Sequence, residues 1–179
     1  MSTQSQLSTG RPEVSEYAPY YHKYISRVPD GPITDILEQQ IARTAAFLRG
    51  LSEEQAASRP APDKWSVKQI VGHLCDSERV FAYRALCFAR GDQNALPSFE
   101  QDDYVREAGS DERSLAELIA EFELVRRSGV QLFRSFKPET LQRRGIASSN
   151  PVSVRGLMYI TAGHEIHHYE LLKQRFGKS

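Results

Sequence analysis

The chain has 179 residues, of which 40% are hydrophobic and 26% are charged, and this composition is typical of a soluble globular protein with one core. Its 23 basic residues balance 23 acidic ones, so the net charge is zero and neither nucleic acid nor an anionic membrane surface is an expected partner. No segment approaches the roughly 20 apolar residues that cross a bilayer, and the polar N-terminus lacks the apolar run of a signal peptide, so we expect a cytoplasmic protein.

The N-terminal part of the chain is predicted to hold a tail and the first helix. The polar composition of residues 1–16 predicts a disordered tail, and residues 17–179 are expected to form a single domain. A tyrosine-rich strip follows the tail and ends at the turn signal PDGP, residues 29–32. Apolar residues at helical spacing then predict a first helix over residues 33–51.

Three more helices are predicted downstream. The second, residues 66–90, begins with the capping-box sequence S-V-K-Q, and the third, residues 114–136, begins with a second capping box and ends before a Lys-Pro pair. The fourth spans residues 153–176 behind a serine cap. Four amphipathic helices without a competing strand pattern predict an all-α, antiparallel four-helix bundle. The long connection over residues 91–113 is expected to be a crossover or to cover one end of the bundle.

The segment AGHEIHHYELL in the fourth predicted helix contains three of the five histidines of the chain. On a helical wheel His164 and His168 lie about 40° apart in the middle of the apolar face, and Leu171 lies about 20° from His164. A buried imidazole without a partner costs roughly 1–3 kcal/mol, and a divalent ion bound by both rings would remove that cost. In the alternative without a metal, each ring pairs with a core hydroxyl such as that of Thr161.

His73 is the only histidine of the second predicted helix. It lies about 80–90° from the centre of that helix's apolar arc, at the boundary of the core, where a histidine by itself is interpreted as structural or exposed. Together with His164 and His168 it would complete a three-histidine site with one open coordination position, which is typical of a catalytic metal. His167 is expected to face solvent or to lie beside the ligands, and His22 is expected at the surface unless the tyrosine-rich strip folds over the bundle.

The same segment contains the letters H-E-x-x-H of zinc metalloproteases, with Glu165 in the position of the general base. Those enzymes take a third ligand from further downstream, but the remaining YELLKQRFGKS contains no histidine and its one acid, Glu170, points to the opposite face of the helix. A metalloprotease is therefore excluded. Glu165 stays a candidate catalytic base or a hydrogen-bond acceptor beside the metal ligands, with a solvated acid on the helix surface as the alternative, and the same alternative applies to Asp76 and Glu78.

Two motifs in combination resemble the DinB-like superfamily from about residue 17 to the end of the chain. They are W-S-x-x-x-x-x-G-H-L-x-D-S-E, present in KWSVKQIVGHLCDSE, and the C-terminal H-x-x-x-H. The resemblance is to the branch that includes the bacillithiol transferases and metal-dependent hydrolases. It implies a four-helix bundle, often a homodimer, with a three-histidine site for zinc or nickel that matches His73, His164 and His168.

The resemblance and the histidines together favour a metal-dependent enzyme that acts on a small molecule. A hydrolase would use a metal-activated water, whereas an S-transferase would bind a low-molecular-weight thiol, its co-substrate, as the thiolate. Arg84 and Tyr104 are candidates for binding an anionic group of the substrate, with salt bridging and core packing as the alternatives. The second hypothesis is a non-catalytic, metal-stabilised binding or sensing module, in which a fourth protein ligand would close the site.

Overall fold

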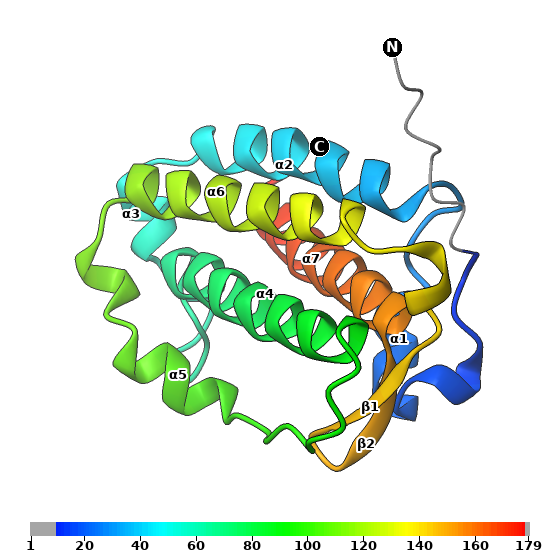
Figure 1. Cartoon of the computed structure of the whole chain (residues 1–179). Helices are drawn as coiled ribbons and strands as arrows, with labels where there is room; N and C mark the ends of the chain where they lie inside the picture. Colours follow the sequence, from blue (N-terminus) through cyan, green and yellow to red (C-terminus); the bar gives the residue numbers. More distant parts are fainter. Residues whose placement is uncertain (1–9, 178–179) are drawn as a thin grey trace.

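A computed structural model describes residues 10–177 of the chain. Four long helices form a bundle, α2 (Ile33–Arg49), α4 (Val67–Ala89), α6 (Leu115–Arg134) and α7 (Val154–Phe176) (Figure 1). Both α4 and α2 pack against α6 and α7, so α2 and α4 occupy opposite corners. The all-α four-helix bundle predicted from the sequence is confirmed, and every predicted helix boundary agrees with the observed one within two residues.

The long connection between α4 and α6 returns the chain to the end of the bundle at which α4 begins (Figure 1). It contains α5 (Gln101–Glu107) and a 3-10 turn (Ser110–Glu112), and α5 lies beside α4. Because of this crossover, α4 runs parallel to α6 and α2 runs parallel to α7, whereas the pairs α4/α7 and α2/α6 are antiparallel. The expected crossover is therefore present. The sequence predicted an antiparallel bundle, but of the four neighbouring helix pairs only α4/α7 and α2/α6 are antiparallel.

The N-terminal segment is folded from residue 10 onward, which corrects the prediction of a disordered tail over residues 1–16; residues 1–9 of that prediction lie outside the described part of the chain. Glu16 is only 2% exposed, and its carboxylate accepts a hydrogen bond of 2.8 Å from Nε of Arg155 at the start of α7. This buried charge pair attaches the segment to the bundle.

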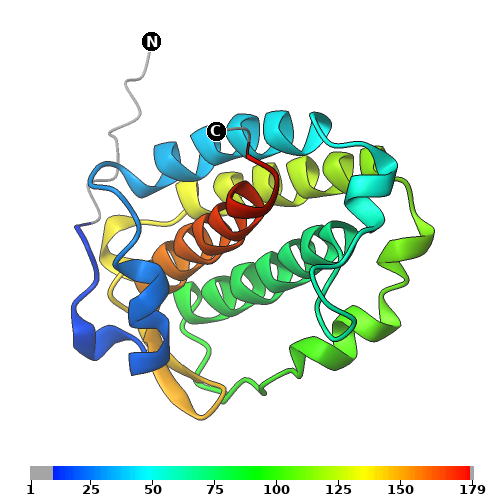
Figure 2. The same cartoon turned by 180° about the vertical axis from the view of Figure 1, so that it is seen from behind.

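Two 3-10 turns (Val14–Glu16 and Pro19–Tyr21) lead into the short helix α1 (His22–Ile25). As seen from behind in Figure 2, α1 lies against α7, and the contacts between the two helices are extensive. The tyrosine-rich strip, which includes His22, therefore folds over the bundle.

A β-hairpin between α6 and α7 was not predicted. A 3-10 turn (Pro138–Thr140) precedes it, and strands β1 (Arg144–Ala147) and β2 (Asn150–Ser153) pair antiparallel. The two turn residues, Ser148 and Ser149, have φ angles of 51° and 62°, a conformation for which hairpins usually use Asn or Gly. Four-residue strands joined by Ser-Ser carry no clear alternation and no glycine signal, which explains why the sequence pattern missed them.

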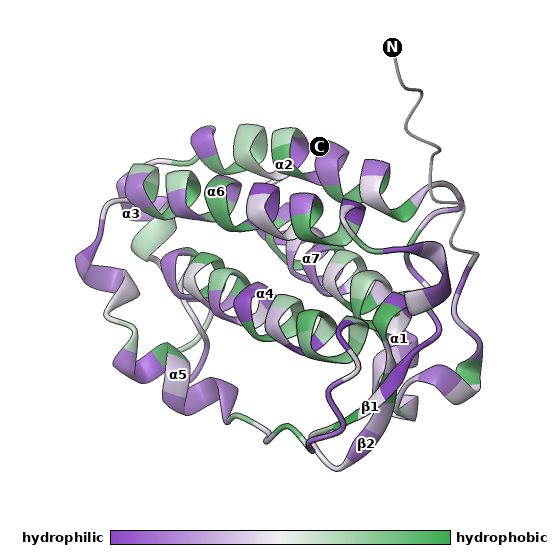
Figure 3. Cartoon of the chain, viewed as in Figure 1, coloured by the Kyte–Doolittle hydropathy of each residue, from purple (hydrophilic) through white to green (hydrophobic). Residues whose placement is uncertain are grey.

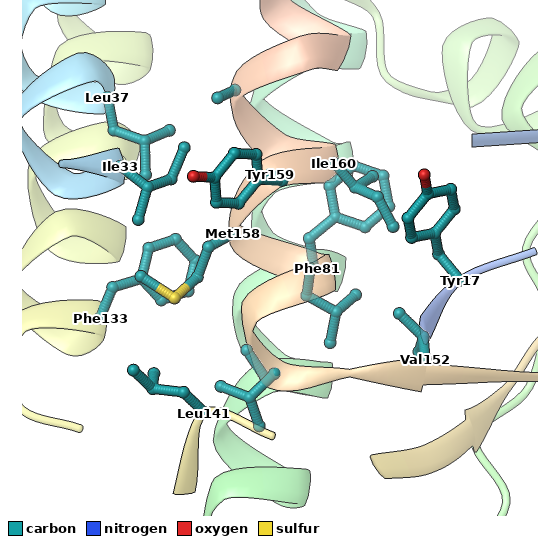
Figure 4. Packing of buried hydrophobic residues seen from close by; sticks show 14 of the residues in the cluster. Tyr17, Ile33, Leu37, Phe81, Phe133, Leu141, Val152, Met158, Tyr159 and Ile160 are labelled. Atoms are coloured by element: carbon teal, nitrogen blue, oxygen red, sulfur yellow. The ribbon is translucent and has the colours of Figure 1, made fainter. Parts of the chain in front are cut away.

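Hydrophobic and hydrophilic residues alternate along α2 and α6, as expected for helices with one buried face (Figure 3). The buried apolar residues form two clusters along the bundle. The larger cluster is next to the hairpin and the N-terminal segment, and Figure 4 shows in it Tyr17, Phe133, Val152, Met158 and Ile160. The second lies near α3 (Glu53–Ala57). No helix in the described residues is long and apolar enough to cross a membrane.

A buried ion pair lies between the two clusters. Arg126 of α6 is 1% exposed, and its Nη2 and Nε atoms donate to the Glu78 carboxylate of α4 at 2.6 and 2.8 Å. Its Nη1 atom donates to Oε1 of Gln40 of α2 at 2.6 Å. Because loss of either partner would leave an uncompensated buried charge, this network holds three helices in one register.

Glu16→Gln should lower the free energy of unfolding at neutral pH by about 1–3 kcal/mol, since it removes the charge from a buried carboxylate–arginine pair. Burial alone would raise the pKa of Glu16, but hydrogen bonds from Arg155 and Ser153 outweigh it and lower the pKa from 4.5 to about 2. A carboxyl group with a lowered pKa stabilises the fold above its unfolded pKa and loses that effect as the pH falls through the folded value.

The difference between wild type and Glu16→Gln in urea denaturation should therefore be constant above about pH 6 and shrink between pH 4.5 and 2. Glu139→Gln, at an exposed position, is the matched control and should change little at any pH. A difference for Glu16→Gln that does not depend on pH would contradict the assignment.

Candidate metal centre

Two serine caps define the starts of the helices that carry the histidines. Ser66 Oγ accepts a hydrogen bond of 3.0 Å from the Gln69 amide, and the Gln69 side chain returns to the Ser66 amide, which completes the predicted capping box of α4. Ser153 Oγ accepts from the Gly156 amide at 2.9 Å and caps α7. These caps determine where α4 and α7 begin, and the antiparallel packing of the two helices then brings their histidines to the same level of the bundle.

The three predicted ligands come together inside the bundle. His73 lies in the second turn of α4, and His164 and His168 lie one turn apart on α7. The Nε2 atom of His164 is 3.1 Å from Nε2 of His73 and 3.2 Å from Nε2 of His168. Ligating atoms of all three residues lie within 4.8 Å of one another, and the residues are 3%, 5% and 8% exposed in chain order.

The separations fit a shared divalent ion. Zinc–nitrogen bonds of about 2.0–2.1 Å at tetrahedral angles place two ligand nitrogens about 3.3 Å apart, close to the two shortest distances. The Nδ1 atoms of His164 and His168 are buried and have no hydrogen-bond partner among the described residues, so the polar contacts of these rings must be made at Nε2. Thr161 donates its hydroxyl to the Leu157 carbonyl at 2.9 Å, which leaves no support for the alternative that it satisfies a histidine.

Burial keeps the three imidazoles neutral. It lowers the pKa of His73 to about 4 and that of His168 to about 3, and it lowers the pKa of His164 well below its usual value. The neighbouring imidazoles add to the effect at His164 and His168, because positive charges so close together would repel. Neutral imidazole is the form that binds a metal, so the site requires no deprotonation at pH 7.

Aromatic side chains surround the imidazoles. Trp65 stacks on His168 with an interplanar angle of 17° and lies 4.8 Å from the His73 ring. Tyr24 of α1 meets the His164 ring edge-on at 5.4 Å. These rings restrict the orientations that the imidazoles can adopt and exclude water from their edges.

Two cavities reach the three-histidine cluster from different sides. The smaller, of about 220 Å³, is lined by His73 and His164, by tyrosines of the N-terminal segment and by Ser148 of the hairpin. The larger, of about 630 Å³, is lined by His168, by the segment before α4 including Trp65, and by apolar and charged side chains of α4, α5 and the end of α7. Leu171, predicted on the buried face of α7, is instead 45% exposed and lines this larger cavity.

Glu165 has contacts that its sequence position did not reveal. It is fully buried, which corrects the expectation of a solvated acid, and its carboxylate binds the Arg43 guanidinium at 2.9 Å and accepts a hydrogen bond from the Thr44 hydroxyl, both on α2. Glu78 is likewise engaged by Arg126. A catalytic role for Glu165 stays a prediction, and its contacts support a structural role.

The two predicted substrate-binding residues lie in different places. Arg84 is 3% exposed and donates to Ser148 Oγ at 3.0 Å, next to the smaller cavity. Tyr104 is 46% exposed, packs against Phe99 and lines a separate cavity between α4 and α5 that also contains Asp76. The structure therefore brings Arg84, but not Tyr104, close to the cavity beside the histidines.

The remaining two histidines are not part of the cluster. His167 is half-buried, and its ring lies between those of Tyr24 and His168, which places it beside the ligands as one of the two expectations had it. His22 is exposed and shares a hydrogen bond with the Tyr17 hydroxyl.

Sequence reasoning missed several residues that line the site. Tyr20, Tyr21 and Tyr24 form one wall of the smaller cavity, and Ser148 contributes from the hairpin. The tyrosine-rich composition of the strip was a usable signal for an aromatic wall, but Ser148 had none, because its place depends on an unpredicted turn.

Gly163→Ala should destabilise the protein by about 1–3 kcal/mol, because overpacking forces the surrounding backbone to move. A Cβ atom at this position would lie 2.2 Å from the Tyr24 carbonyl oxygen, so α1 would have to move away from α7 and from His164. Gly129→Ala is the matched control, since nothing lies within 4 Å of the added carbon. That control should stabilise α6 by about 0.5–1 kcal/mol. Thermal or urea denaturation giving the same sign for both variants would contradict the close contact.

Glu165→Gln should lower the stability, because an amide cannot accept hydrogen bonds from both Arg43 and Thr44; the loss of charge contributes little, since burial raises the pKa of Glu165. The Glu165→Gln variant should bind as much divalent metal as the wild type, measured by mass spectrometry, since Glu165 is outside the group of converging ligand atoms. A large loss of turnover with unchanged stability would instead assign it the catalytic role.

Comparison with known proteins adds a family and a fold. The sequence profile of the DinB superfamily matches residues 36–172, which include all three clustered histidines. Among solved structures, the chain is similar to YfiT from Bacillus subtilis, described as a probable metal-dependent hydrolase with an unusual four-helix bundle topology. The TM-score is 0.73 over 95% of each chain at 17% identity, so the likeness concerns the fold. No curated protein matches the chain.

Proposed function

The chain belongs to the DinB superfamily, and from this premise we propose that it is a metal-dependent enzyme that acts on a small molecule at the three-histidine cluster. The observation that carries the proposal is the convergence of three buried, neutral imidazoles on one point, with Nε2 separations of 3.1 and 3.2 Å. The three buried Nε2 atoms face one another, and a divalent ion shared between them would give these nitrogens the partner that they otherwise lack.

The donor set favours a catalytic site over the alternative of a metal-stabilised binding module. In the described residues, the group of possible ligands at this point contains His73, His164 and His168 and no cysteine or carboxylate that would close the coordination sphere. Three protein ligands leave a position for water or substrate, and the smaller cavity adjoins two of the ligands. A divalent ion in such a site lowers the pKa of a water or thiol that binds it and so supplies a nucleophile at neutral pH.

Hydrolysis is the reaction with the better support. The similar structure of YfiT carries a description as a probable metal-dependent hydrolase, and at 17% identity this supports the proposal by analogy of fold alone. Transfer of a low-molecular-weight thiol is the second candidate, because the open position would accept a thiolate equally well. Zinc or nickel as the ion, a homodimer and a cytoplasmic location stay predictions.

Purified protein reconstituted with zinc or nickel should hold about one ion per chain by metal analysis, because three neutral imidazoles converge on one point. His164→Ala should abolish binding, since it removes the nitrogen adjacent to both other ligands. His167→Ala is the matched control on the same helix and should retain the ion. A reconstituted wild type without metal, or loss of metal only in His167→Ala, would contradict the site.

The reaction itself is tested with the reconstituted full chain on simple esters and amides, with and without a thiol plus an electrophile. Turnover that needs metal but no thiol supports the hydrolase, and turnover that needs both supports the S-transferase. A fully loaded protein in which metal spectroscopy detects no exchangeable ligand would support the non-catalytic module.

A further inference from the structure

Arg84 is a buried cation to which the described residues offer no carboxylate partner. It is 3% exposed, and burial lowers its pKa because the charged form is desolvated. Arg126 and Arg155 are both paired, with Glu78 and Glu16 respectively. Within residues 10–177, however, no carboxylate lies at ion-pair distance from Arg84. Since an unpaired buried charge is unfavourable, the location of Arg84 calls for a negative partner that residues 10–177 do not supply.

The contacts of Arg84 direct its charge toward the smaller cavity. Its Nη2 atom donates to the Pro97 carbonyl at 2.7 Å and to Ser148 Oγ at 3.0 Å. A serine oxygen that accepts a hydrogen bond keeps its own proton for a further acceptor, and no such acceptor for Ser148 is found in the described part of the chain. Ser148 and Tyr21 both line the cavity that reaches His73 and His164.

The backbone at Ser148 is held in an unfavourable conformation. With φ at 51° and 62°, Ser148 and Ser149 both occupy the left-handed region that glycine or asparagine adopts more readily. Glycine at either position would relieve this strain but would remove the side-chain hydroxyl. Only the hydroxyl of Ser148 is directed at the cavity wall, since Ser149 is exposed and does not line it.

The charges around the cavity indicate which ligand it accepts. Three neutral ligands leave the charge of a divalent ion uncompensated at one end, and Arg84 adds a positive charge, whereas the lining contains one acid, the exposed Glu100. Arg84 follows His73 by eleven positions, which is about 16 Å along the axis of α4 and about 20° around it, so both lie on one face of the helix. The two cationic centres are therefore separated by about the length of a small molecule.

We propose that the hydroxyls of Ser148 and Tyr21, backed by Arg84, bind a carboxylate or phosphate group of the substrate at the end of the smaller cavity away from the histidines. The substrate class is thus a small anionic molecule whose reacting bond lies several atoms from its charged group. This rests on the proposed function for the position of the reacting bond, and the anion site itself consists of residues that do not ligate the metal.

The test is titration calorimetry of the full chain with inorganic phosphate and, separately, acetate, in metal-loaded and metal-free protein. Metal-free wild type should bind at least one of the two anions, and Ser148→Gly should weaken that binding about tenfold or more, because it removes a hydrogen bond to a charged group. Ser149→Gly is the matched control and should bind as the wild type does.

Thermal denaturation separates lost binding from lost folding. Ser149→Gly should melt at or above the wild-type temperature, because glycine adopts the observed φ angles without strain. Ser148→Gly gains the same relief but loses the acceptor of a hydrogen bond from Arg84, and it should still unfold in one cooperative transition. Tyr21→Phe should weaken anion binding in the same direction as Ser148→Gly. Equal affinities for wild type, Ser148→Gly and Tyr21→Phe, or no anion binding by metal-free wild type at millimolar concentrations, would overturn the proposal.

The same measurements distinguish this inference from the proposed function. If the wild type binds no metal but Ser148→Gly loses anion binding, the anion site is supported and the proposed enzyme is contradicted. If the wild type binds metal at the histidines but Ser148→Gly has the same anion affinity as the wild type, the metal site is supported and the anion site is contradicted.

Discussion

The antiparallel packing of α4 against α7 is the constraint on which the rest of the structure depends. It places His73 of one helix opposite His164 and His168 of the other, with all three residues buried. Buried imidazoles need partners at their nitrogens, so this interface is stable only with a polar or metallic centre. The arrangement makes the same three residues a structural requirement of the core and the centre of the proposed chemistry.

The other faces of α7 keep it from rotating out of that position. On α2, Thr44 and Arg43 bind the Glu165 carboxylate, and Gln40 donates to the Ala162 carbonyl at 3.0 Å. Gln40 in turn accepts from Arg126, which is paired with Glu78 of α4. A continuous buried network therefore connects both histidine-bearing helices to α2 and α6, and a helix rotated away from this register would leave charges without partners.

Access to the histidines is decided by segments outside the four long helices. The N-terminal strip contributes tyrosines, the hairpin contributes Ser148, and the crossover contributes Phe99 and Glu100 to one small cavity. These pieces lie far apart in the sequence, and the crossover brings its part there only because α4 and α6 run parallel. The positive character of the cavity, with Arg84 behind its wall, gives this enclosure a chemical selectivity that the bundle alone does not provide.

Periodicity and capping signals determined the four long helices, and the spacing of His164 and His168 together with the position of His73 determined the candidate ligands, because these features are local to one helix. Only the tertiary structure decided which neighbours each helix face meets. It buried Glu165 against α2, exposed Leu171 at a cavity, separated Tyr104 from the histidines and placed Arg84 where the described residues offer it no carboxylate. The physical reason is that a repeat pattern specifies the faces of its own helix, whereas burial and pairing depend on residues that approach from distant parts of the chain.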